Sequence, residues 1–199
     1  MNKKPVLQKK EIETFYPASR EAWRLWLQEN HSSKQSIWLV HYKKNSNKPS
    51  LSWSEAVDEA LCFGWIDSTR KTIDAEKFIQ FFSKRKSTSV WSKINKEKVQ
   101  RLMNEGLIMQ AGHESIETAK KNGSWIILDS VEELTIPKDL TAAFKSHPGS
   151  KDFFLSLSKS VRKSILQWLV LAKRPETRQK RINEIAELAA QKLKPKQFR

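Results

Sequence analysis

The stretch SWSEAVDEALCFG (residues 52–64) contains both a start and a stop for one helix, and it begins the part of the chain that decides the fold. Ser52 and Glu55 have the spacing of a capping box, which satisfies free backbone N–H groups at a helix N-terminus, and the closing glycine ends the helix. Directly afterwards, residues 65–72 and 77–83 are two short strand-like runs joined by IDAE, the pattern of a hairpin. A helix followed by a hairpin predicts an α+β fold.

The segments on either side extend this prediction. Upstream, Ser19 caps a predicted helix that ends near Asn30, and residues 36–42 have the β-branched and aromatic composition of a strand. Downstream of residue 83, apolar residues recur every three to four positions, which predicts helices within 92–106, 114–122, 137–144, 158–172 and 175–193. Residues 124–134 fit either a short strand or a buried loop. We therefore predict a small mixed N-terminal sheet with packed helices, followed by an all-helical C-terminal region.

Three parts follow from this division of the chain. Residues 1–15 form a basic tail, residues 16–130 an α+β domain and residues 131–199 a helical domain. The tail is predicted from its charge, since the first ten residues carry four lysines and no acid.

Composition excludes several classes of protein. Cys62 is the single cysteine, which excludes an internal disulfide and any cysteine-rich zinc site, and we interpret it as a buried structural thiol. None of the four histidines has a second ligand at helical spacing, and the glycine motifs of P-loop and Rossmann enzymes are absent, so we expect neither a metal nor a cofactor. The longest apolar stretch, residues 165–172, is far shorter than the roughly 18 residues of a membrane span. The N-terminus lacks the apolar core of a signal peptide, so we expect a cytoplasmic location.

Positive charge is concentrated in two segments of the chain. The 199 residues include 37 Lys and Arg against 22 Asp and Glu, a formal net charge of +15. Residues 84–101 hold seven bases and one acid, residues 102–158 five bases and eight acids, and residues 159–199 twelve bases and three acids. Such segments attract polyanions, because each neutralised phosphate releases condensed counterions. The alternative interpretation is that these side chains only solvate exposed helix faces.

The first basic segment contains a candidate anion-binding site. Cations and hydroxyls there run directly into a predicted helix N-terminus, whose free amides suit a phosphate, and a tryptophan offers a stacking surface for a base or sugar. The candidate residues are Lys84, Arg85, Ser89, Trp91, Ser92, Lys93 and Asn95. The alternative is structural: the serines cap the helix, the tryptophan packs inward, and the lysine and arginine side chains are solvated.

Two further features have both a functional and a structural interpretation. Asp67 is a candidate general acid or base, or it pairs with Arg70 or Arg85. Arg174, Arg178 and Arg181 have the spacing of one basic helix face, which either binds a polyanion or lies in solvent.

Three stretches resemble the YdeI/OmpD-associated family, also called bacteriocin-protection proteins. They are ALCFGWID at residues 60–67, SVWSKIN at residues 89–95, and AKRPETR at residues 172–178 followed by Arg181 and Ile182. The resemblance runs from about residue 16 to residue 194, and it departs where Lys84 stands in place of an expected proline. It implies a link to bacteriocin or antimicrobial-peptide resistance, and the N-terminal part is similar to α+β modules of the YjbR/YdhG kind. No agreed activity, cofactor or catalytic residue comes with the family.

Three functions remain open at this point. The first is a binding module for a polyanion such as nucleic acid, using Lys84, Arg85, Lys93 and Arg101 with the tryptophan between them. The alternative is an enzyme for a small phosphorylated or carboxylated substrate, with Asp67 as acid or base and Arg85 as an anion clamp. The third is a stress-response protein that contacts another protein through exposed tryptophans.

Overall fold

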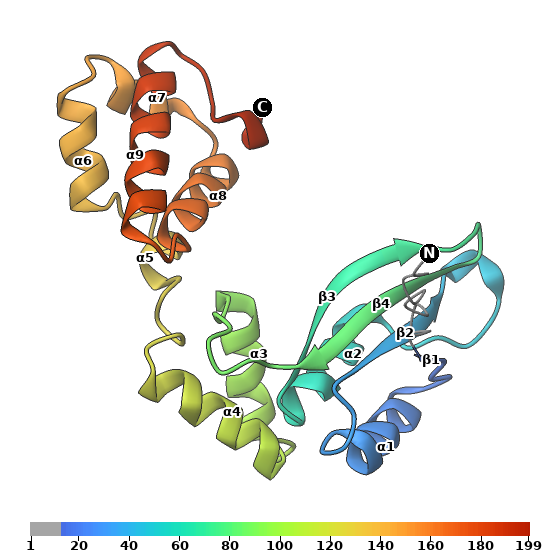
Figure 1. Ribbon diagram of the computed structural model, residues 1–199. Coiled ribbons are helices and arrows are strands. Elements are labelled where there is room, and N and C mark those ends of the chain that lie inside the picture. The colour runs from blue at the N-terminus through green and yellow to red at the C-terminus, as the bar shows by residue number, and fades with distance from the viewer. Residues whose placement is uncertain (1–12) are drawn as a thin grey trace, which may run out of the picture. The chain divides into compact units, whose positions relative to one another are not determined.

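A four-stranded sheet lies at the centre of the N-terminal part of the chain, as the computed structural model of residues 13–199 shows (Figure 1). The strands are β1 (Thr14–Phe15), β2 (Ser36–Tyr42), β3 (Trp65–Thr72) and β4 (Lys77–Lys84), in the order β1-β2-β4-β3. β1 runs parallel to β2, whereas the other two pairs are antiparallel. The mixed sheet, its hairpin and the α+β class are therefore confirmed.

The chain divides into two compact units. The sheet unit comprises the described residues up to Ser89 together with Ile94–Asn122, and the helical unit comprises Val90–Lys93 with Gly123–Arg199. Most of the predicted basic tail lies outside the described residues. Thr14 and Phe15, which the sequence assigned to that tail, pair with β2.

Two helices cover one face of the sheet, α1 (Arg20–Asn30) and α2 (Trp53–Cys62) (Figure 1). Both were predicted, and their N-terminal serine caps and the capping box of α2 are present. Trp23 of α1 is fully buried, lies 5.5 Å from the Phe82 ring of β4 and donates its indole N–H to the Ala56 carbonyl at 3.0 Å. One aromatic side chain thus joins α1, α2 and the sheet into a single core.

The middle of α2 carries two buried acids, each held by two cations. Glu59 is 2% exposed and accepts from Arg20 at 2.5 Å and from Arg24 at 2.7 Å, both on α1. Asp58 is 6% exposed and accepts from Lys98 and Arg101, each at 2.5 Å. The second pair of cations lies on α3 (Lys93–Asn104). Adjacent carboxylates of α2 therefore fasten the helices on either side of it.

A fourth helix, α4 (Gln110–Lys121), begins four residues before its predicted start. This additional first turn contains Gly112. An added Cβ there would lie 2.4 Å from the Cys62 carbonyl oxygen, so the helix backbone packs directly on the end of α2. The backbone N–H of Met109 also donates to that carbonyl, at 2.9 Å. In the sequence a glycine counts against a helix, whereas here it permits the close approach.

The outer strand β3 pairs irregularly with β4. The register shifts between Asp67 and Arg70, as at a β-bulge, and residues 68–72 are exposed. The short 3-10 helix η1 (Lys44–Ser46) follows β2.

The helical unit has its own apolar core. It contains α5 (Asp129–Glu132), α6 (Lys138–Lys145), α7 (Ser150–Ser156), α8 (Lys159–Val170), α9 (Pro175–Ala190) and the 3-10 helix η2 (Lys196–Phe198). Leu140, Leu166, Leu169 and Ala186 are fully buried in this core. Residues 124–134 form turns and α5, so neither interpretation of them included the helix, and α7 was not predicted. The all-helical character of this region is confirmed.

Candidate anion-binding pocket

A pocket of about 440 Å³ lies within the sheet unit, where the ends of α1 and α2 meet the chain after β4 and one face of α4. Its lining combines cations, hydroxyls, one carboxylate and a small apolar surface. The lining residues are His31, Ser32, Phe63, Gly64, Lys84, Arg85, Ser87, Ala111, Glu114, Ser115 and Thr118.

Backbone contacts hold the two cations of the pocket in place. The backbone N–H of Arg85 donates to the Gly64 carbonyl at 2.9 Å, and that of Lys84 donates to the Gln35 carbonyl at 3.0 Å. The Lys84 ammonium donates to the Ser32 carbonyl at 2.7 Å, which fixes it beside the end of α1. Gly64 has a φ of 71°, a left-handed conformation that favours glycine at the turn from α2 into β3.

The guanidinium of Arg85 is in an unusual environment for a cation. Burial lowers its pKa to about 10 from the ordinary 12.5, and the negative charge of Asp67 opposes this shift only in part. Lys84 lines the same pocket, so a negatively charged group placed there would meet two cations.

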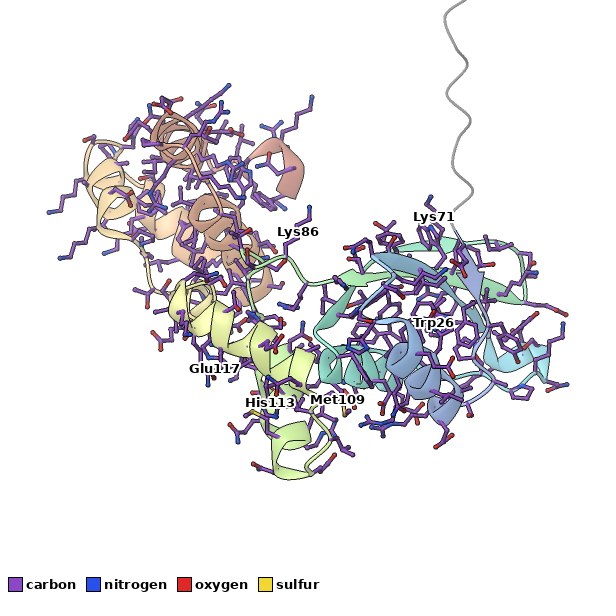
Figure 2. The ribbon with its side chains drawn as sticks, turned by 60° about the horizontal axis from the view of Figure 1, so that its bottom comes forward. Trp26, Lys71, Lys86, Met109, His113 and Glu117 are labelled. Atoms are coloured by element: carbon purple, nitrogen blue, oxygen red, sulfur yellow. The ribbon has the colours of Figure 1, made fainter. Side chains whose placement is uncertain are left out.

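α4 presents different side chains on its two sides. Ala111, Glu114, Ser115 and Thr118 recur every three to four residues and line the pocket. His113 and Glu117, which are labelled in Figure 2, lie one turn apart on the helix, and helical spacing puts them on the side away from Ala111 and Ser115. The helix thus supplies the pocket with two hydroxyls and one carboxylate.

Two rings form the less polar part of the lining. The ring centroids of His31 and Phe63 are 5.2 Å apart. The Nδ1 of His31 donates to the Leu27 carbonyl at 2.9 Å, because a carbonyl oxygen can only accept. The pocket therefore offers both charge and a surface for an organic group.

Only two of the seven predicted anion-binding residues line this pocket, Lys84 and Arg85. Ser89 and Asn95 lie in the sheet unit outside the lining, whereas Trp91, Ser92 and Lys93 belong to the helical unit. Trp91 is 1% exposed and lies 4.9 Å from the ring of Trp125, so it offers no face to a base and the proposed stacking role is wrong. Anion binding at the other residues stays a prediction.

Asp67 does not line the pocket. Its carboxylate accepts from the indole N–H of Trp53 at 2.9 Å and from the Gln80 amide at 3.1 Å. Arg70, one of its two expected partners, lies instead over the Phe78 ring, 3.8 Å from the centroid. The structure therefore shows a carboxylate bound by neutral donors of α2 and β4, close enough to influence Arg85 by its charge.

Two arginines of the predicted basic helix face make contacts within the helical unit. Arg178 donates to the two carboxylate oxygens of Asp139 at 2.7 and 3.1 Å, which ties α9 to α6. Arg181 donates to the Trp168 carbonyl and lies over the ring of that residue, 4.7 Å from the centroid. Of the three arginines, Arg174 is exposed. Two of the three arginines therefore anchor α9, and polyanion binding at this helix face stays a prediction.

The Asp139 pair gives a testable pH dependence. Hydrogen bonding to Arg178 lowers the pKa of Asp139 below its ordinary 3.8. An acid whose pKa is lower in the folded state contributes stability above its unfolded pKa and loses that contribution as the pH falls through the folded value. We expect an NMR titration of the Asp139 carboxyl carbon to show this lowered pKa, and Arg178→Ala to return it to the ordinary range. An unchanged titration in the variant would contradict the pairing.

Within residues 13–199, no group of three or more His, Cys, Asp or Glu side chains is placed to hold a metal ion. Burial raises the pKa of the Cys62 thiol to about 11, so this cysteine is protonated at neutral pH and is not an activated nucleophile.

The helices of the described chain are all too short or too polar to cross a membrane. A family model described as a domain of unknown function (DUF8412) matches residues 15–115, and one described as "Bacteriocin-protection, YdeI or OmpD-Associated" matches residues 133–192. No curated protein and no solved structure matches the chain. Two of the three stretches that carried the resemblance fall within the first match. The chain therefore belongs to the family of DUF8412, a domain of unknown function, and residues 133–192 form a YdeI/OmpD-associated, bacteriocin-protection domain.

Proposed function

We propose that the protein binds a small organic anion in the Arg85 pocket, through a carboxylate or phosphate group. The observation that carries this proposal is that two cations, Lys84 and Arg85, line one cavity together with hydroxyls and two rings. A cavity of about 440 Å³ is in the size range of small-molecule sites. It is far larger than an inorganic ion requires, and its two rings suit an organic group.

Binding of a polyanion such as nucleic acid is the second candidate. Its support is the net charge of +15 and the exposed Lys86, which directly follows the two cations of the pocket. Against it, Lys98 and Arg101 of the first basic segment are held by Asp58, and Arg178 of the second is held by Asp139. Fewer cations are therefore available for phosphates than the sequence indicates. The pocket is the better supported site.

Two further points concern the biological role of the protein and the enzyme alternative. The family description leads us to propose that anion binding serves bacteriocin or antimicrobial-peptide resistance, in the cytoplasm. An enzyme with Asp67 as acid or base is not favoured, since Asp67 lies outside the pocket lining.

Titration with benzoate and phenyl phosphate tests the pocket. We expect both to shift the NMR signals of residues around Arg85, and Arg85→Met to weaken binding by about tenfold or more, as the loss of a charged hydrogen bond predicts. Arg174→Met, the same change at an exposed arginine of the helical unit, should leave binding unchanged. Equal binding by wild type and Arg85→Met would refute the site. A steep fall of nucleic-acid affinity with salt, unaffected by Arg85→Met, would favour the second candidate.

Thermal unfolding of wild type and Arg85→Met separates lost binding from misfolding. Loss of binding in a variant that unfolds near the wild-type temperature assigns the effect to the missing charge. A large fall in the unfolding temperature would assign it to the fold instead.

A further inference from the structure

We infer that the ligand of the Arg85 pocket is zwitterionic, joining an anionic group to a primary ammonium on one small molecule. This inference rests on the proposed function and adds the class of the ligand. It is carried by Glu114, a carboxylate that lines the same cavity as the two cations but comes from a different element. Lys84 and Arg85 stand at the end of β4, whereas Glu114 is on α4.

The Glu114 carboxylate accepts a hydrogen bond from the neutral Gln110 amide, whose nitrogen donates to Oε1 at 2.9 Å. A carboxylate has about four acceptor positions on its two oxygens. Glu114 is exposed at the pocket mouth, in contrast to the buried Asp58 and Glu59, which are each held by two cations within the protein.

The charges of the lining determine which ligands fit. A ligand with only negative charge is attracted by Lys84 and Arg85 but repelled by Glu114 in the same cavity. A ligand that also carries an ammonium gains at both ends, because electrostatic complementarity selects partners by charge pattern. Neutral groups such as sugar hydroxyls would find their partners in the hydroxyls of Ser115 and Thr118, which line the same pocket. The Glu114 carboxylate in the lining therefore favours an ammonium group on the ligand.

Matched pairs of ligands test this directly on the full chain. Each pair has the same anionic group with and without an amine: glycine and acetate, β-alanine and propionate, 4-aminobutyrate and butyrate, 6-aminohexanoate and hexanoate, and 2-aminoethyl phosphate and ethyl phosphate. The series varies the distance between the charges, and its last pair separates phosphate from carboxylate. We expect at least one amine to bind about fivefold more tightly than its amine-free partner, the effect of an ion pair that is partly open to solvent.

Glu114→Gln is the decisive variant. It keeps the shape of the side chain and removes the charge, so the preference for the amine should disappear while the amine-free partner binds as well or better. Glu117→Gln makes the same change on the other side of α4 and should preserve the preference (Figure 2).

The outcomes separate the two proposals. If amine-free anions bind at Arg85 but no pair shows a preference, or if Glu114→Gln leaves the preference unchanged, the zwitterion inference is overturned and the proposed function stands. If no member of any pair binds, the zwitterion inference is overturned, and the benzoate and phenyl phosphate titrations alone decide the proposed function.

Discussion

Replacing Glu59 by glutamine is expected to destabilise the protein by about 3–5 kcal/mol, the cost of removing one member of a buried ion pair. Glu59 is 2% exposed and accepts from both Arg20 and Arg24. The glutamine would fill the same space, yet it would leave two guanidinium groups of α1 without the negative charge that offsets their desolvation. The size of the effect follows from this uncompensated charge.

Urea unfolding of wild type and variant measures the difference. Glu117→Gln is the matched control, because Glu117 pairs with Lys120 at 2.8 Å on the surface, 57% exposed. An exposed pair of this kind is worth at most about 1 kcal/mol. Equal losses in the two variants would show that burial of Glu59 does not govern the energy of its ion pairs.

Replacing Gly112 by alanine is expected to cost about 3 kcal/mol or more and to weaken anion binding at the same time. The new Cβ would lie 2.4 Å from the Cys62 carbonyl oxygen and 2.9 Å from an Ile108 methyl group. Backbone cannot rotate away as a side chain can, so α4 must move, and the energy of overpacking exceeds the roughly 1 kcal/mol that alanine gains in a helix. Since Glu114 and Ser115 follow on the same helix, the pocket moves with it.

Thermal unfolding and benzoate titration of Gly112→Ala test both parts. Gly106→Ala is the control, since an added Cβ there meets no atom within 4 Å and only the φ of 67° is strained. We expect that control to lose about 1 kcal/mol and to keep its affinity. A Gly112→Ala protein with wild-type stability would contradict the close packing of α4 on α2.

Local patterns in the sequence were sufficient for most of the sheet unit. The capping box at Ser52 and the alternation in residues 77–83 each depend on neighbours within a few residues, so one sequence contains the information. β1 has only two residues and depends on pairing with a strand more than twenty positions away. No local pattern distinguishes such a strand from a tail.

Only those pocket residues that are neighbours in the sequence could be predicted. Lys84 and Arg85 were found because they are adjacent in a basic run, whereas His31, Phe63 and Glu114 are brought to them by packing between distant elements. The two interpretations of Trp91 could not be separated from the sequence, because aromatic residues beside cations occur both in cores and in binding sites, and only burial distinguishes them. Asp58 and Glu59 resemble solvated acids in the sequence, and their partners lie tens of residues away.

The two edges of the sheet also bear on how the protein behaves at high concentration. An open edge strand is a template for strands of other molecules, and natural sheets limit this with short strands, bulges and charge. Here one edge, β1, has two residues, and the other, β3, is interrupted between Asp67 and Arg70 and carries Arg70 and Lys71. Both edges are therefore protected against intermolecular β-aggregation without any helix having to cover them.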